Sequence, residues 1–175
     1  VFDLFDQTLF YGDEDGGYAA LCYAISAPGA RVVAVTPAAP SEPEPERYQP
    51  DTDNLSVASH VLWLHDPFAT DSVLPSQSAD VLTTRHLLPN AKARLIRYGV
   101  FWPLLEGAMA ADIDVVALYQ GLRARRQDRT YVRRMARLCT DAGQHARAAI
   151  LIGSFAKRSG RRGFIDDYNF MIQEH

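Results

Sequence analysis

The sequence is short of the features that mark disulfide-rich, zinc-bound and membrane proteins. It has only two cysteines, Cys22 and Cys139, and both lie in segments with helical spacing of apolar residues, which is typical of buried free thiols. No apolar run approaches the roughly 20 residues that span a bilayer, and no signal peptide is recognisable. These absences argue against a disulfide scaffold and tetrahedral zinc. They predict a soluble, cytoplasmic protein without a membrane span.

The two ends of the sequence also lack expected signals. The chain begins at Val1 instead of methionine, and it ends at His175 without a helix stop signal. We therefore expect that it is truncated at one or both ends. Its length of 175 residues predicts a single domain over residues 1–175.

Basic residues are scarce in the first half of the chain and abundant in the second. Residues 1–90 hold 13 Asp and Glu against 3 Lys and Arg, whereas residues 91–175 hold 8 against 15. This polarity favours two lobes across a cleft, a basic surface that meets an anionic ligand, or solvated helix faces. The overall charge of −3 and the lack of a reader motif argue against nucleic-acid binding.

The first third of the chain has the pattern of a βαβ unit. The apolar residues of 1–10 predict a strand, the spacing of apolar residues over 17–27 predicts a helix, and the β-branched run over 31–36 predicts a buried strand. Between the first strand and the helix lies an acidic, glycine-bounded stretch, residues 11–17. Because open α/β sheets bind ligands at the carboxyl ends of their strands, we expect the functional site in this loop.

The acidic loop supplies candidate residues for catalysis and for cofactor binding. Glu14 and Asp13 are the candidate catalytic carboxylates, since a carboxylate can serve as a general base. Gly12, Gly16 and Gly17 are candidate cofactor-binding residues, because glycine adopts backbone angles that other residues avoid.

Two alternatives to this interpretation use other acidic residues. The adjacent acids of residues 13–15 could bind one divalent cation in a metal-dependent hydrolase, although the chain lacks a His/Asp set at recognisable spacing. Asp6-Gln7-Thr8 resembles the later half of the haloacid-dehalogenase motif, but Leu4 stands at the nucleophile position and argues against that activity.

The rest of the chain alternates between strand and helix patterns. An exposed loop rich in proline and acids is expected over 37–54. Further strands are predicted over 60–65, 80–84, 93–100 and 148–155, the second of which also fits a helix end, and helices over 115–122, 132–139 and 165–174. The fold class is therefore α/β, a Rossmann-like single domain with a mostly parallel central sheet flanked by helices and a helix-rich second half.

His65 and Asp66 follow the strand predicted over 60–65. They are expected at the same edge as the acidic loop, where His65 is a candidate base with Asp66 as its orienting partner. The other interpretation of His65 is a polar residue that ends a strand.

In the order of its blocks, the chain resembles the WcbI-type polysaccharide-biosynthesis family of capsule-assembly proteins. The similar blocks are Gly12-Asp13-Glu14-Asp15 before a helix, a leucine-proline turn at 87–90, an aromatic-proline step at 97–103 and an acidic helix at 164–168. The resemblance implies an acyltransferase that binds coenzyme A. That family has a cysteine in Gly-Asn-Cys-Gln where this chain has Glu14, so the resemblance also implies altered chemistry.

These observations favour a transferase of acyl or glycosyl type in polysaccharide biosynthesis. Arginines would hold a phosphate-bearing donor, coenzyme A or a nucleotide sugar, and Glu14 or His65 would be the base for a sugar or polysaccharide hydroxyl. The candidate donor-binding arginines are Arg97, Arg123, Arg126 and Arg129. No metal cofactor is expected. The alternative is a non-catalytic α/β interaction domain whose charged halves mediate self-association as a homo-oligomer.

Overall fold

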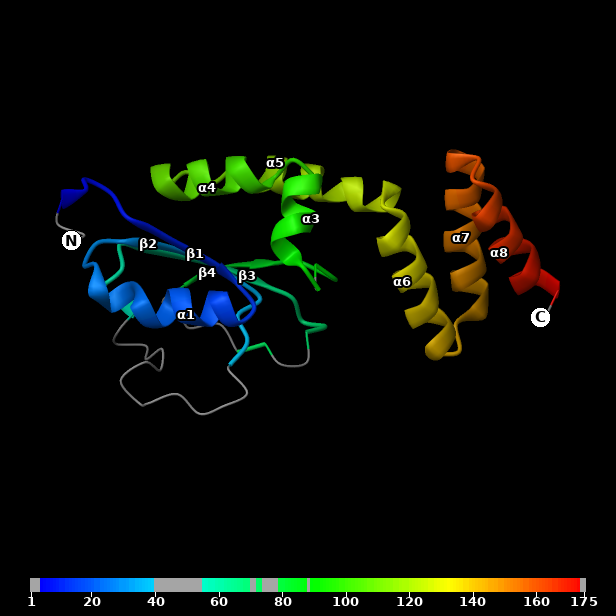
Figure 1. Ribbon diagram of the computed structural model, residues 1–175, viewed down its shortest axis with the longest axis horizontal. Helices are drawn as coiled ribbons and strands as arrows, with labels where there is room; N and C mark the ends of the chain where they lie inside the picture. The colour runs from blue at the N-terminus through cyan, green and yellow to red at the C-terminus, as the bar shows by residue number, and fades with distance from the viewer. Residues whose placement is uncertain (1–3, 40–54, 70–71, 74–78, 88, 174–175) are drawn as a thin grey trace. The chain divides into compact units, whose positions relative to one another are not determined.

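A computed structural model describes residues 4–39, 55–69, 72–73, 79–87 and 89–173 of the chain (Figure 1). The chain divides into two compact units, residues 1–118 and residues 119–175. The prediction that the two form a single domain stays a prediction.

The first unit is built on a four-stranded parallel sheet in the order β1-β2-β3-β4. Its strands are β1 (Leu9–Asp13), β2 (Arg31–Val35), β3 (His60–His65) and β4 (Asp80–Thr83). The sheet confirms the predicted α/β class with its parallel sheet. The strand order has no reversal among these four strands, and such a reversal is where Rossmann-type folds bind their ligands.

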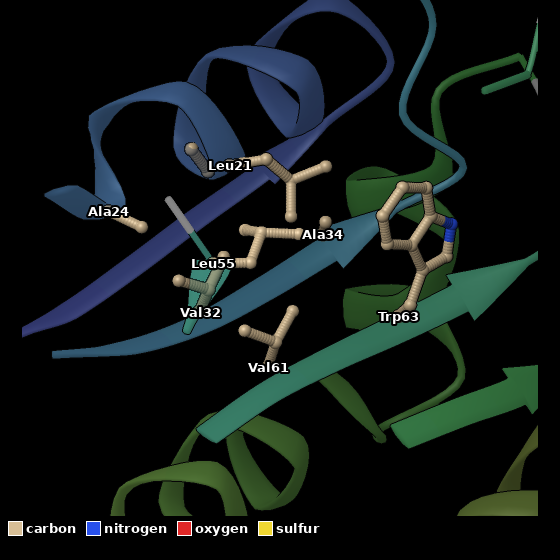
Figure 2. Close-up of a cluster of buried hydrophobic side chains, with 8 residues drawn as sticks. Leu21, Ala24, Val32, Ala34, Leu55, Val61 and Trp63 are labelled. Atoms are coloured by element: carbon tan, nitrogen blue, oxygen red, sulfur yellow. The ribbon is translucent and has the colours of Figure 1, made fainter. Parts of the chain in front are cut away.

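Helices cover both faces of this sheet. Helix α1 (Asp15–Tyr23), which continues into a 3₁₀ turn, η2 (Ala24–Ser26), packs on β1 and β2. Helix α4 (Phe101–Ala110) packs on β2 from the other face (Figure 1). Figure 2 shows the core under α1, where alternate residues of β2 and β3 meet the helix. The buried residues of this core are Ala20, Leu21, Ala24, Val32, Ala34, Leu55, Val61 and Trp63.

The strand predicted over residues 1–10 is wrong for most of its described length. The strand begins only at Leu9, and Leu4 and Phe5 are exposed. Apolar content alone suggested a strand there, but only the segment from Leu9 onward pairs with β2. The strand instead extends to Asp13, into what was expected to be loop.

The strand predicted over residues 93–100 is also wrong, because this segment forms helix α3 (Ala91–Arg97). Its buried residues are Ala91, Arg94, Leu95 and Tyr98, which have the i, i+3, i+4, i+7 spacing of one helix face. The helical period was therefore present in the sequence, and it begins two residues before the segment that was predicted to be a strand.

In its described residues the second unit contains the helices α6 (Arg129–Asp141), α7 (His145–Ser159) and α8 (Arg162–Gln173). A 3₁₀ segment, η4 (Arg123–Gln127), precedes them, and α5 (Val115–Leu122) spans the boundary between the units. The helices predicted over 115–122, 132–139 and 165–174 are confirmed, the last of them starting three residues earlier. Their core is formed by Val132, Ala136, Ala148, Ile152, Phe155, Ala156 and Phe164.

The strand predicted over 148–155 is wrong, because it lies within α7. Its buried residues Ala148, Ile152, Phe155 and Ala156 follow a helical period. A short apolar run has the same appearance in a buried strand and in a buried helix, and here the helix continues for 15 residues.

Most of the loop predicted over 37–54, residues 40–54, lies outside the described residues. None of the helices within the described ranges combines the length and the apolar character that crossing a membrane requires.

Candidate functional site

A one-residue turn connects the first strand to the first helix, at the carboxyl edge of the sheet. Strand β1 ends at Asp13, α1 begins at Asp15, and Glu14 between them has φ 51° and ψ −123°. Its N–H donates to the Val35 carbonyl at 3.1 Å, and its own carbonyl accepts from the N–H groups of Gly17 and Tyr18. The predicted acidic loop over 11–17 is therefore wrong as a loop, since all but Glu14 belongs to a strand or a helix.

The glycines of this motif serve packing at two positions and leave open space at one. A Cβ atom on Gly12 would lie 1.9 Å from the Gly16 carbonyl oxygen, and one on Gly17 would lie 3.2 Å from Pro37. Gly12 and Gly17 thus allow α1 to approach β1 and the chain after β2 closely. Of the three predicted cofactor-binding glycines, only Gly16 has no atom of the described residues within 4 Å of its Cβ position, and it alone leaves room there for a ligand.

The carboxylates of Asp13 and Glu14 lie together at the N-terminus of helix α3. A Glu14 Oε1 atom accepts from the Asn90 N–H at 3.3 Å, and Asp13 Oδ2 accepts from the Lys92 N–H at 3.1 Å. These backbone groups have no acceptor within the helix, so the two carboxylates act as caps and match its positive end. The structure brings the two predicted catalytic acids together, and one oxygen of each accepts a hydrogen bond from the backbone at the start of α3.

Tyr11 lies on the same face of β1 as Asp13, two residues before it. Its ring packs edge-on against Phe101 with centroids 5.1 Å apart, and its buried hydroxyl has no hydrogen-bond partner among the described residues. Burial, and secondly the negative charge of Asp13, raise the pKa of the Tyr11 phenol well above its ordinary value. Nothing in the sequence analysis singled out Tyr11, because residues 11–17 were expected to form a loop, whereas Tyr11 lies in β1.

Thr36 is a second residue that the sequence did not single out. It follows β2, its N–H donates to the Leu64 carbonyl at 2.7 Å, and its φ is 46°. Its hydroxyl is fully buried and has no partner among the described residues. A positive φ is rare for a β-branched residue and a buried polar group is normally paired, so Thr36 is an outlier on both counts.

His65 is not part of the carboxylate cluster. In the sheet register Asp13 aligns with Val35 and Val35 with Leu64, so the next residue, His65, points to the opposite face from Asp13. Two strand spacings place the His65 backbone roughly 10 Å from that of Glu14.

The proposed pairing of His65 with Asp66 is wrong. The buried Asp66 carboxylate accepts from the N–H groups of Phe68 at 3.0 Å and Leu87 at 3.2 Å, and it thereby ties together the loops after β3 and β4. His65 Nδ1 is buried without a partner among the described residues. Asp66 is an anchor for the backbone, and it does not orient His65.

The four candidate donor-binding arginines are exposed, and they fall in different units. Arg97 lies in the last turn of α3, about 10 Å along the helix axis from the capped end. Arg123 and Arg126 lie in η4, where residues three apart are eclipsed, and Arg129 starts α6. Arg123, Arg126 and Arg129 thus belong to the helical unit, and Arg97 to the sheet unit.

Another arginine of the helical unit connects helices α6 and α8. Arg133 pairs with Asp167 at 3.0 Å and lies over the Phe164 ring at 4.6 Å. In the described part of the chain, no group of three or more His, Cys, Asp or Glu side chains is arranged to bind a metal ion.

No protein-family model matches the chain, and searches of curated proteins and of solved structures find no significant similarity.

Proposed function

We propose that the protein is a transferase of acyl or glycosyl type in which the Glu14 carboxylate is the general base. The observation that carries this proposal is a cluster of strained backbone conformations at one edge of the sheet. Glu14, Thr36 and Asn90 all have positive φ, and hydrogen bonds connect Glu14 to Asn90 and to the residue before Thr36. Such conformations cost on the order of 1 to 3 kcal/mol each and gather where function requires them.

The position of Glu14 supports a reactive role for its side chain. A sharp strand-to-helix turn presents the nucleophile of α/β-hydrolases above the sheet, in a motif with glycine two residues before and two residues after it. Gly12-Asp13-Glu14-Asp15-Gly16 has glycine at both positions and Glu14 at the centre. The close approach of Gly12 to Gly16 explains why such a turn requires glycine at the first position.

The chemistry that fits a carboxylate at this position is removal of a proton from an acceptor hydroxyl. The hydroxyl oxygen then attacks the acyl or anomeric carbon of the donor, and the leaving group departs with the bonding electrons. The first backbone N–H groups of α1, at Asp15 and Gly16, can stabilise negative charge that develops next to Glu14. The open space at Gly16 gives a substrate access to them.

The donor in this proposal carries phosphate, as coenzyme A and nucleotide sugars do. Within the helical unit, the exposed arginines at positions 123, 126 and 129 support phosphate binding, because a guanidinium group donates two hydrogen bonds to one phosphate. A sugar or polysaccharide acceptor is supported by the resemblance of sequence blocks alone.

Binding of the donor is tested by thermal melting with coenzyme A, its adenosine bisphosphate fragment and nucleotide sugars. We expect a concentration-dependent rise in Tm with one class of donor, and loss of that rise in the double variant Arg126→Ala, Arg129→Ala. Arg161→Ala, at an exposed arginine of the same unit, is the control and should keep the rise. If none of these ligands shifts Tm, the donor assignment is wrong.

Catalysis is tested with the donor that shifts Tm, by mass-spectrometric detection of its leaving group in the presence of sugar acceptors. We expect Glu14→Gln to lower turnover about 100-fold or more, the usual contribution of a general base, and to keep donor binding. Asp15→Asn, at the exposed neighbouring acid, should retain turnover. Turnover that survives in Glu14→Gln would disprove the role of Glu14.

A further inference from the structure

The helical unit carries a net charge opposite to that of the sheet unit. Residues 119–175 hold 12 Arg and Lys against 5 Asp and Glu, a net charge of +7, whereas residues 1–118 hold 6 against 16, a net charge of −10. The overall charge of −3, which argued against nucleic-acid binding, therefore combines two units of opposite sign. The helical unit by itself is strongly basic, which is typical of surfaces that bind polyanions.

The basic residues of this unit gather at one end of its helices. Because short turns connect α6 to α7 and α7 to α8, helix α6 begins, α7 ends and α8 begins at the same end (Figure 1). A hydrogen bond of 3.4 Å from Arg158 Nη2 to the Arg126 carbonyl connects η4 to this end as well. We call residues 123–130 and 157–163 the basic end.

The basic end holds eight Arg and Lys residues and one acid. That acid, Asp128, is the N-cap of α6 and accepts from the N–H groups of Thr130 and Tyr131 at 2.9 and 3.4 Å. The opposite end of the α6–α7 hairpin, residues 138–147, has one acid and one arginine. The cations of the basic end are Arg123, Arg125, Arg126, Arg129, Lys157, Arg158, Arg161 and Arg162, all exposed except the half-buried Arg125. The positive charge of the unit is therefore concentrated at one end.

The composition and width of the basic end fit a row of phosphates. Seven of its eight cations are arginines, whose planar guanidinium groups can each donate two hydrogen bonds to one phosphate. Packed helices lie about 8 to 10 Å apart, and the phosphates of a duplex follow one another at about 3.4 Å of rise along each strand. Cations spread over three helix ends can therefore reach several phosphates at once.

The side chains around the basic end favour a duplex over a membrane or a single strand. Membrane-binding surfaces place Trp, Phe or Leu beside their basic residues, and single strands stack their bases on aromatic side chains. Among the described residues, the exposed large apolar side chains closest in sequence to the basic end are Tyr119 and Ile165, at 39% and 41% exposure. Tyr131 at this end is half-buried, with Arg125 over its ring at 5.5 Å. The surface thus offers phosphate contacts and little for acyl chains or bases.

We propose that the basic end binds the phosphate backbone of a nucleic-acid duplex without reading its base sequence. Phosphate contacts position a protein on a duplex and carry no sequence information directly. The surface includes Arg123, Arg126 and Arg129, which were proposed above for a donor phosphate, and it extends beyond them to the ends of α7 and α8. It does not depend on Glu14 or on the proposed transferase activity.

Binding is tested with the full chain by fluorescence anisotropy of labelled DNA and RNA duplexes of mixed sequence. We expect saturable binding at about 50 mM salt, and a log–log dependence of Kd on salt that corresponds to about four or more phosphates. Duplexes of different sequence should bind alike. A preference for DNA or for RNA identifies the type of duplex, and either one supports the proposal.

Three double variants separate the basic end from net charge. Arg161→Ala, Arg162→Ala should weaken binding about tenfold or more at about 50 mM salt and reduce the salt slope by about 2. Arg161→Lys, Arg162→Lys keeps the charge and should recover the slope. Arg137→Ala, Arg147→Ala is the matched control, because it makes the same change in net charge at exposed positions outside the basic end. This control should bind as the wild type does.

The proposal is overturned if duplexes do not bind saturably, or if the control weakens binding as much as Arg161→Ala, Arg162→Ala does. Tighter binding of single strands, or of phosphatidylcholine vesicles that contain phosphatidylserine, would equally overturn the assignment of a duplex. The donor assignment fails or holds separately. Because Arg161→Ala should keep the rise in Tm with the donor, Arg161→Ala, Arg162→Ala should lose duplex binding and keep that rise.

Discussion

Each of the two compact units has a glycine at a point of close approach, but the neighbouring atoms differ. In the sheet unit, a Cβ on Gly12 would lie 1.9 Å from a backbone oxygen of α1. In the helical unit, a Cβ on Gly153 would lie 2.6 Å from Cε2 of the half-buried Tyr168 ring. A ring can rotate, whereas a backbone oxygen moves only with its helix. The junction that holds Glu14 is therefore rigid, and the contact between α7 and α8 is adaptable.

The largest effect is expected from Gly12→Ala. The new methyl group must push α1 away from β1, so the free energy of unfolding should fall by about 3 kcal/mol or more, measured by urea denaturation. Gly16→Ala is the matched control. Its methyl group enters open space within helix α1, so this variant should be neutral or more stable by up to about 1 kcal/mol. Similar stability of the two variants would contradict the rigid junction.

A smaller loss, about 1 kcal/mol, is expected from Gly153→Ala in the helical unit. The methyl group displaces the Tyr168 ring, and the gain in helix propensity partly offsets this cost. In a Tyr168→Ala background the same substitution should stabilise the protein by up to about 1 kcal/mol. The double-mutant cycle measures this change of sign, and additive effects would show that the ring is not the obstacle.

The smallest effect at neutral pH is expected from Tyr11→Phe, which tests how tightly the sheet unit packs at β1. The stability that comes from burying a neutral phenol is fully present below its unfolded pKa of about 10 and is lost as pH rises through the raised folded value. The free energy of unfolding of the wild type should therefore fall as pH rises in this range. Partial exposure of the phenol reduces the size of this fall. In Tyr11→Phe the free energy of unfolding should fall less. Equal alkaline slopes in urea unfolding would contradict the burial of the hydroxyl. At pH 7 the variant should equal or slightly exceed the wild type, because it lacks the unpartnered group.

The two units also differ in how well their sequences predicted them. The buried strands over 31–36 and 60–65 were recognisable, because β-branched and apolar residues bounded by turn signals are typical of a parallel sheet. The runs over 93–100 and 148–155 are also rich in apolar residues, but residues 93–97 belong to α3 and residues 148–155 to α7. Their buried residues follow a helical period, but a window of eight residues is too short to distinguish that period from the pattern of a buried strand.

The sequence predicted that Asp13 and Glu14 lie at the carboxyl edge of the sheet, but it did not predict their surroundings. Register places His65 on the other face from Asp13, and Asp66 is engaged by the backbone of a distant loop. The capping of α3 joins residues more than 70 positions apart, at separations of 76 and 79. No local sequence pattern pointed to Thr36, because its positive φ arises from its position directly after the end of β2.

The hydrogen bond from the Asn90 N–H to Glu14 links the side chain proposed as general base to an amide that solvent can reach. A substrate that takes over this oxygen of Glu14 must leave the Asn90 amide without its acceptor. Deuterium uptake at that single amide should then rise when the site is occupied. Hydrogen exchange at the first turn of α3 would thus report substrate binding at Glu14, without any label attached to the substrate.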